Sequence, residues 1–213
     1  MNFNLIDIDK MASVAVNNWR SDWADQLMIT LSGTWIWSPL YAFLIGLMIY
    51  TYRRASWMVV LGVILLVGMA DWTSVHFFKN VFMRLRPSRD PSLEGLLFLP
   101  HGRGGLYGFV SSHAANLFAI AAYVTWVLKK RFRIFGYGIM YVWAAVIGYS
   151  RIYLARHFLG DVVCGALWGM LLAYGMTWLI HSWLSKAYPS ASQYLYLPRT
   201  RLKRKEARRE VSS

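Results

Sequence analysis

The chain has 213 residues, of which 57% are hydrophobic, 16% aromatic and only 15% charged, and its mean hydropathy is +0.35. This composition argues against an ordinary soluble domain and is typical of a polytopic membrane protein. The formal net charge of +13 could indicate a nucleic-acid partner in a soluble protein. Here the basic residues collect in loops and in the tail, so membrane topology explains the charge and no nucleic-acid partner is expected.

Residues 1–34 form the first predicted unit, an N-terminal surface-helix region. A signal peptide is not expected, because Asp7 and Asp9 precede Lys10 and no uninterrupted apolar core follows. The segment is predicted to be an amphipathic helix on the membrane surface, with a partly disordered N-terminus as the alternative. The short apolar stretch 26–31 is expected to extend this helix into the first span, and a separate sixth span is the alternative.

Residues 35–185 form the second predicted unit, an all-α transmembrane helical bundle of about five spans. Each span is close to the ~20 residues that a bilayer crossing requires. Several spans are bracketed by Trp or Tyr, which anchor helices at membrane interfaces. Cys164, the single cysteine, lies inside an apolar run and is expected to pack as a small apolar residue. The five predicted spans are 35–52, 57–78, 112–128, 134–149 and 161–183.

Basic residues between the spans predict the orientation. Two arginines follow the first span, four Lys and Arg residues lie within 129–133, and the third unit, 186–213, is a strongly basic tail. The positive-inside rule places all three in the cytoplasm, with a weaker alternative role for the tail in holding anionic lipid headgroups. The N-terminus, the loop 79–110 and the segment 150–161 then lie outside. We expect a bacterial inner-membrane protein whose site faces the periplasm or exterior.

The segment "SRIYLARHFLGD", residues 150–161, places ionisable groups at the junction of two apolar runs. Such groups are costly at membrane depth unless they are paired or line a polar cavity. His157 and Asp161 are four residues apart and would share one face of a helix. A carboxylate in that position can orient a nucleophilic imidazole. The alternative is an interfacial pair that only caps a helix.

Several residues outside and within this segment are expected to bind an anion at this end of the bundle. Lys79, Arg86 and Arg151 would bring three cations to one outward cavity. Ser111 and Ser112 lie at a predicted helix N-terminus, where free N–H groups attract anions. A second histidine follows them at position 113, which allows one histidine to act as nucleophile and the other as proton donor.

These segments resemble the type 2 phosphatidic acid phosphatase superfamily, which includes acid phosphatases and vanadium haloperoxidases. "KNVFMRLRP" matches the family pattern K-x6-R-P, and "SRIYLARHFLGD" matches S-R-x5-H-x3-D. "VSSH" matches P-S-G-H in part, with Val110 in place of Pro and Ser112 in place of Gly. The order of spans and motifs extends the resemblance from about residue 20 to residue 183.

The resemblance implies a role for each motif residue and no metal or other cofactor. His157 would attack phosphorus to form a phosphohistidine, Asp161 would orient it, and His113 would protonate the leaving group. The remaining motif residues would hold the phosphate: Lys79, Arg86, Ser111, Ser112 and Arg151. The serine at position 112 replaces the family's glycine and can still present its backbone N–H.

The expected function is an integral membrane lipid phosphatase acting at the extracytoplasmic face. Polyprenyl (undecaprenyl) diphosphate is the first expected substrate. Phosphatidylglycerol phosphate, phosphatidic acid and lipid A phosphates are the alternatives. A lipid phosphotransferase and a non-catalytic lipid-binding membrane protein are alternatives of other classes. The sequence specifies no oligomeric state.

Other basic residues near the motifs are expected to have lesser roles. Arg84 and Arg89 would widen the anion field without contacting phosphate. Arg156 is expected to point to lipid headgroups or water. His101 and Arg103 lie in a Gly-rich outer loop that is expected to be solvated, with a lid over the headgroup as the alternative.

Overall fold

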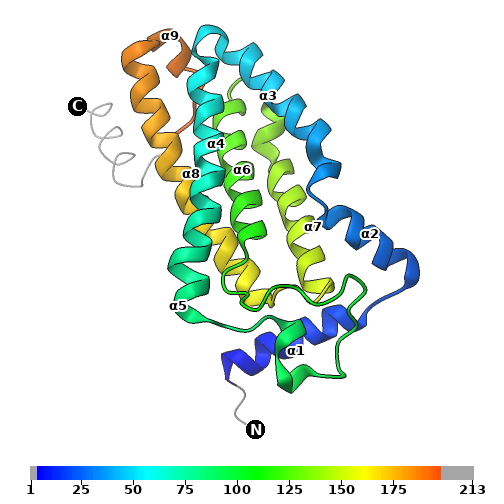
Figure 1. Cartoon of the computed structure of the whole chain (residues 1–213). Helices are drawn as coiled ribbons and strands as arrows, with labels where there is room; N and C mark the ends of the chain where they lie inside the picture. The colour runs from blue at the N-terminus through cyan, green and yellow to red at the C-terminus, as the bar shows by residue number, and fades with distance from the viewer. Residues whose placement is uncertain (1–3, 198–213) are drawn as a thin grey trace, which may run out of the picture.

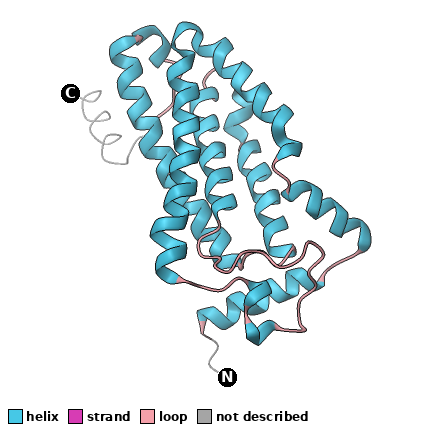
Figure 2. Ribbon diagram, in the orientation of Figure 1, coloured by secondary structure: helices cyan, strands magenta, loops and turns pink. Residues whose placement is uncertain are grey.

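The structure is a computed structural model that describes residues 4–197, and the expected all-α fold is confirmed. Five long helices lie side by side, and the described part of the chain has no strand (Figures 1 and 2). Only an isolated bridge joins Leu85 to Tyr107. The five helices are α3 (Ser38–Tyr52), α4 (Ser56–Thr73), α6 (Ser112–Leu128), α7 (Ile139–Tyr153) and α8 (Leu159–Ala187).

Two stretches of residues 4–197 are long and apolar enough to cross a membrane by length and composition. They are Trp35–Phe82, which includes α3 and α4, and Leu159–Ala187. Ser112–Leu128 is an apolar but shorter helix. The count of five spans therefore stays a prediction.

The predicted fourth span, 134–149, has the wrong boundaries. Its helix, α7, begins at Ile139 and ends at Tyr153, and a 3₁₀ turn (η6, Arg133–Tyr137) precedes it. Gly138 separates the two segments with a φ of 80°, in the left-handed region that favours glycine. The glycine therefore ends one helical segment before the next begins, which apolar character alone does not reveal.

The two helices that carry motif residues, α6 and α8, pack with their backbones in close approach. Small residues line this contact, including Ala115 and Gly169. A Cβ on Gly165 would lie 2.6 Å from the carbonyl oxygen of Ser111, so glycine is needed there. Small residues are what allow membrane helices to approach each other in this way. This contact fixes the start of α6 against the start of α8.

The N-terminal region forms two helices rather than one. The first, α1 (Leu5–Asn18), lies across one end of the bundle, and the second, α2 (Asp22–Ser32), packs beside α7 (Figure 1). A break at Gly33 separates α2 from the short 3₁₀ turn η1 (Trp35–Trp37) and α3. The expectation that 26–31 continue as one helix into the first span is therefore wrong. A location of this region at the membrane surface stays a prediction.

Loops at the two ends of the bundle differ in length. The end near α1 carries the long segment 83–111, preceded by a π-helical turn (η3, Ser74–Lys79) and α5 (Asn80–Phe82) (Figure 2). Two 3₁₀ turns lie within this segment, η4 (Pro87–Arg89) and η5 (Pro91–Leu93). The turn between α7 and α8 lies at the same end (Figure 1). The segments predicted to face outward therefore gather together.

The opposite end carries the segments predicted to face the cytoplasm. They include the 3₁₀ turn η2 (Arg53–Ala55) and the connection 129–138. The first part of the expected tail packs here, because α9 (Pro189–Ser192) is followed by the buried Leu195, and the Tyr196 amide donates to the Trp126 carbonyl at 2.9 Å. The rest of the basic tail, residues 198–213, lies outside the described residues.

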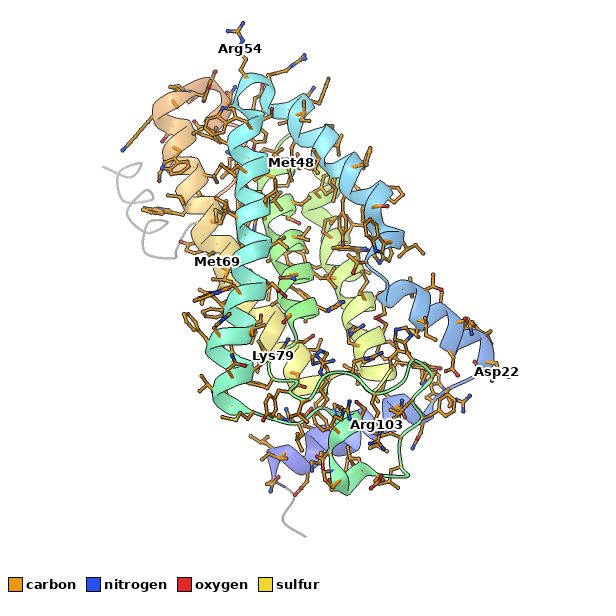
Figure 3. The ribbon with its side chains drawn as sticks, viewed as in Figure 1. Asp22, Met48, Arg54, Met69, Lys79 and Arg103 are labelled. Carbon is orange, nitrogen blue, oxygen red and sulfur yellow. The ribbon has the colours of Figure 1, made fainter. Side chains whose placement is uncertain are left out.

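The structure allows the predicted orientation to be tested with one cysteine at each end. Arg54 and Arg103 lie at opposite ends of the bundle (Figure 3). In a Cys164→Ser background, we expect an impermeant thiol reagent to label Arg103→Cys in intact cells and Arg54→Cys only after the membrane is opened. The reverse pattern would overturn the orientation.

Candidate active site

The predicted site residues lie where several elements begin or end, at the end of the bundle that α1 crosses. Lys79 ends η3 (Figure 3), Arg86 lies in the segment 83–111, and Arg151 lies in the last turn of α7. The other predicted residues lie at the start of α6 (Ser111, Ser112 and His113), in the α7–α8 turn (His157) and in the first turn of α8 (Asp161).

Lys79, Arg86 and Arg151 each donate to a neutral oxygen. Lys79 Nζ donates to the Ser112 hydroxyl at 2.6 Å, and Arg86 Nε donates to the Tyr107 carbonyl at 3.0 Å. The guanidinium of Arg151 donates to the hydroxyl of a serine in α2, Ser32. Within residues 4–197, none of the three is within ion-pair distance of a carboxylate. Their charge therefore remains uncompensated and suits an anion.

His157 is buried beside these cations, with only 2% of its surface exposed. Burial and the nearby charges of Arg86, Arg151 and Lys79 hold the pKa of His157 well below its usual value of 6.5. The imidazole is therefore neutral near pH 7. A neutral imidazole keeps a ring-nitrogen lone pair that can attack an electrophile.

Asp161 lies beside His157, but the two are not hydrogen-bonded. The distance from His157 Nδ1 to Asp161 Oδ2 is 3.6 Å, which is too long for a hydrogen bond. His157 lies in the turn just before α8 rather than within the helix. The carboxylate instead accepts from the Phe158 amide at 3.0 Å, which caps α8. The prediction that His157 and Asp161 share one face of a helix is therefore wrong, and no direct hydrogen bond joins them.

Arg84 supplies the ion pair that Asp161 needs in its fully buried position. Arg84 Nη1 donates to Asp161 Oδ1 at 2.9 Å, and Arg84 Nη2 donates to Asp9 Oδ2 at 2.6 Å. Arg84 was expected to widen the anion field, but two carboxylates compensate its charge. The spacing of Arg84 from Arg86 carries no signal for this role, because the partner Asp9 lies 75 residues earlier in the chain.

Two other arginines bind the outer segment. Arg156 was expected to point to headgroups or water, but its Nη2 donates to the His101 carbonyl at 2.6 Å. Arg89 donates through Nε and Nη2 to the Gly104 carbonyl, at 3.2 and 3.0 Å. The His101 side chain is exposed, as is Arg103, whose guanidinium lies 3.6 Å from Glu94. The Arg156 contact holds the Gly-rich part of the segment against the turn that carries His157, and the Arg89 contacts fold the segment on itself.

The start of α6 completes the site. Ser111 is buried, its hydroxyl caps the helix by accepting from the Ala114 amide at 3.3 Å, and its own amide donates to the Asp161 carbonyl at 3.0 Å. The first turn of α6 presents backbone N–H groups of the kind that bind anions. His113 follows within this turn and is half-buried.

A largely apolar cavity of about 430 Å³ extends from His113 along the bundle. Its walls come from η1, α3, α4, α6 and α7, and include Trp37, Leu44 and Val63. Ser32 and Gly33 line it near the α2–α3 break. The site therefore has a polar, cationic part and an apolar part that meet at His113.

No group of three or more His, Cys, Asp or Glu side chains within residues 4–197 is arranged to hold a metal ion. The charged groups that converge on the site are cations, which suit an anionic ligand.

Comparisons with known proteins agree on one family. The family model of the PAP2 superfamily matches residues 56–185, more than half of the chain. The lipid A 4'-phosphatase of Bacteroides thetaiotaomicron is 32% identical over 169 residues, which cover 78% of this chain and 73% of that protein. The lipid A 4'-phosphatase of Porphyromonas gingivalis is 28% identical over 177 residues, which cover 80% and 72%.

Two solved structures share the fold. The PAP2 type phosphatidylglycerolphosphate phosphatase from Bacillus subtilis superposes with a TM-score of 0.64 at 23% identity, covering 87% of this chain and 89% of that one. LpxE of Aquifex aeolicus superposes with a TM-score of 0.55 at 24% identity, covering 82% and 96%. At these identities the superpositions support the helical arrangement alone.

The packing of Gly108 provides a test of the site geometry. A Cβ on Gly108 would lie 2.9 Å from Asp161 Oδ2 and 3.1 Å from Arg86 Cγ, whereas a Cβ on Gly105 would come no closer than 3.9 Å to Arg86. We expect Gly108→Ala to lower phosphate release at least about tenfold, because small displacements of reacting groups are costly. Gly105→Ala is the matched control and should stay within about twofold. Equal activity in the two variants would contradict this geometry.

Proposed function

The chain belongs to the PAP2 superfamily and is a membrane phosphatase acting on lipid, and from this premise we propose that it hydrolyses a phosphate monoester of lipid A at the extracytoplasmic face. The observation that carries the proposal is the convergence of three uncompensated cations on a buried, neutral His157 at the end of an apolar cavity.

The substrate assignment rests on what the relatives are named for. Both curated relatives are lipid A 4'-phosphatases, and each aligns with more than two thirds of its own length. This favours lipid A over polyprenyl diphosphate, the first expectation from sequence. Phosphatidylglycerol phosphate has weaker support, because the neighbour named for it is similar in fold at only 23% identity.

The phosphate-binding step uses the cations and the start of α6. Lys79, Arg86 and Arg151 bind the phosphoryl oxygens, with the backbone N–H groups near Ser111 and Ser112. These groups stabilise the negative charge that grows on the oxygens in the transition state. A protein that supplies this charge has no need of a divalent ion in the reaction.

The chemical step forms a phosphohistidine. Because Nδ1 of His157 faces Asp161, Nε2 is the nitrogen that attacks phosphorus. The step requires His113 to be protonated in the substrate complex, where the negative charge of the bound phosphate offsets the nearby cations. The Nε2–P bond then forms as the bond from phosphorus to the lipid oxygen breaks, and His113 gives its proton to that oxygen. Water then attacks phosphorus with His113 as the base, which releases phosphate and restores His157. The Asp161 carboxylate stabilises the imidazolium character of the intermediate.

The apolar cavity fits the rest of a lipid substrate. It begins at His113 and continues between helices at the depth of the bundle core, where an acyl chain can bury methylene groups. A substrate with its phosphate at the cations would place its leaving oxygen next to His113. The phosphate would therefore lie at the cations, and the rest of the lipid, beyond the bond that is cleaved, would lie in the cavity.

A lipid panel tests the substrate. The purified protein in detergent with EDTA should release phosphate from lipid A faster than from undecaprenyl diphosphate or phosphatidylglycerol phosphate. Mass spectrometry should show loss of the 4'-phosphate. The control is His157→Ala, which should release none. Faster phosphate release from either of the other two lipids would contradict the proposed substrate. Activity that requires added Mg²⁺ would contradict the proposed mechanism. Transfer of labelled phosphate to a second lipid would instead indicate a phosphotransferase.

A leaving-group comparison tests the roles of the two histidines. His157→Ala should be inactive on every substrate, because a nucleophile is needed whatever leaves. His113→Ala should lose about 10²–10⁴ in rate on a lipid alcohol phosphate, the typical contribution of a general acid. The first-turnover release of p-nitrophenol from p-nitrophenyl phosphate should be partly spared, because that leaving group departs without a proton. Equal losses of first-turnover leaving-group release on both substrates would show that His113 is not the general acid.

A further inference from the structure

Helix α1 presents a polar stripe to the turn that carries His157. The stripe consists of Asp9, Ser13 and Asn17, which are spaced four residues apart and so share one helix face. Asp9 Oδ1 accepts from the Gly160 amide at 2.8 Å, and the Ser13 hydroxyl accepts from the Leu159 amide at 3.1 Å. The first turn of any helix leaves such N–H groups without intrahelical partners. Side chains of α1 therefore cap α8 from outside.

Asn17 binds the other end of the same turn. Its Nδ2 donates to the Tyr153 carbonyl, the last residue of α7, at 2.7 Å, and to the Phe98 carbonyl at 2.9 Å. Its Oδ1 accepts from the Phe98 amide at 2.8 Å. The polar stripe therefore spans the α7–α8 turn from the end of α7 to the start of α8 and ties it to the outer segment.

Several apolar side chains of α1 point away from this contact, although Val16 packs against the small cluster of Ala114, Ile152 and Val162. Leu5, Ile8 and Met11 are exposed, while Ser13 and Asn17 are buried. Beside this small apolar contact, hydrogen bonds and ion pairs are the contacts through which α1 docks. Directional contacts of this kind fix the register of one element on another.

Asp9 reaches the catalytic pair through Arg84. Its Oδ2 lies 2.6 Å from Arg84 Nη2, and Arg84 Nη1 lies 2.9 Å from Asp161 Oδ1. The guanidinium is thus held between two carboxylates on different elements. The Cζ atom of Arg84 also lies 4.2 Å from the ring centre of Phe158, the residue next to His157. These contacts leave Asp161 Oδ2 on the side of His157.

We propose that α1 is a positioning element of the active site and that Asp9 acts through Arg84 to hold Asp161 beside His157. This inference rests on the proposed function, because it assigns a purpose to the His157–Asp161 pair. Asp9 and Arg84 are positioning residues, since neither touches the reacting atoms. Without the Asp9 carboxylate, Arg84 is held on one side only. The Arg84 guanidinium can then move and displace the Asp161 carboxylate, or it can turn toward the phosphate-binding cations.

The main test compares two neighbouring residues of α1. Asp9→Asn keeps the size of the side chain and an oxygen for the Gly160 amide but removes the charge that holds Arg84. Lys10→Gln is the matched control, because Lys10 pairs with Asp90 at 2.6 Å and contacts neither Arg84 nor Asp161. With p-nitrophenyl phosphate we expect kcat to fall about tenfold in Asp9→Asn, by analogy with supporting residues around other sites. It should stay within about twofold in Lys10→Gln.

A second measurement separates positioning from a general loss of structure. Inhibition by inorganic phosphate reports the cation cluster of Lys79, Arg86 and Arg151. In Asp9→Asn, KM and the inhibition constant for phosphate should stay within about threefold while kcat falls. A parallel loss of kcat and phosphate binding, or an unfolded Asp9→Asn protein beside a folded Lys10→Gln protein, would show a structural role and overturn the proposal.

A double-mutant comparison tests whether Asp9 acts through Arg84. Adding Asp9→Asn to Arg84→Gln should lower kcat by less than twofold further, because the link is already broken. Arg84→Lys, which keeps the charge, should recover part of the activity lost in Arg84→Gln, and Arg84→Met, which also breaks the link, serves as the background if Arg84→Gln does not fold. Full additivity would contradict the link. Absence of phosphate release by the wild-type protein would instead count against the proposed function itself.

Discussion

The ion pair between Arg84 and Asp161 is the interaction on which the active-site end of the bundle depends. Asp161 is 0% exposed, and a buried carboxylate is strongly destabilising unless a cation pairs with it. The same Arg84 binds Asp9, and the Asp161 carbonyl accepts from the Ser111 amide. Through its carboxylate and its backbone carbonyl, Asp161 therefore links α8 to the segment 83–111, to α6 and, by way of Arg84, to α1. The helices of the bundle pack through small and apolar residues, but these polar contacts determine how their ends are arranged around His157.

Basic residues at this end fall into two groups with different partners. Arg84 has two carboxylate partners, so its charge is compensated within the protein. Lys79, Arg86 and Arg151 donate to neutral oxygens, so their field is available to an anion. The same field keeps His157 neutral, as a nucleophile requires. A phosphate dianion that enters would offset the repulsion among the three cations, and this gain favours binding and stabilises the transition state.

Short-range spacing made much of the site predictable from sequence. The order of the motifs along an apolar chain was sufficient to expect Lys79 and Ser112 at one end of a bundle. In the structure, Lys79 Nζ lies 2.6 Å from the Ser112 hydroxyl oxygen. Contacts between distant segments could not be predicted in this way. Arg84 lies between two motif positions, so the sequence alone suggests that it binds anions. Only the fold shows that it pairs with Asp9 of α1. The four-residue spacing of Asp9, Ser13 and Asn17 was a readable signal for a polar helix face, but it did not indicate which surface that face would bind. The start of α7 depended on the backbone conformation of a single glycine.

The central claim is that His157 carries the phosphoryl group, and trapping that intermediate tests it most directly. In His113→Ala, transfer from p-nitrophenyl phosphate needs no acid, whereas hydrolysis of the intermediate loses its base, so the intermediate should accumulate. After rapid quenching of a reaction with ³²P-labelled substrate, the account predicts acid-labile label in the peptide that contains His157, confirmed by mass spectrometry. Label on another residue, or turnover of this variant with no covalent label at any time, would contradict the account.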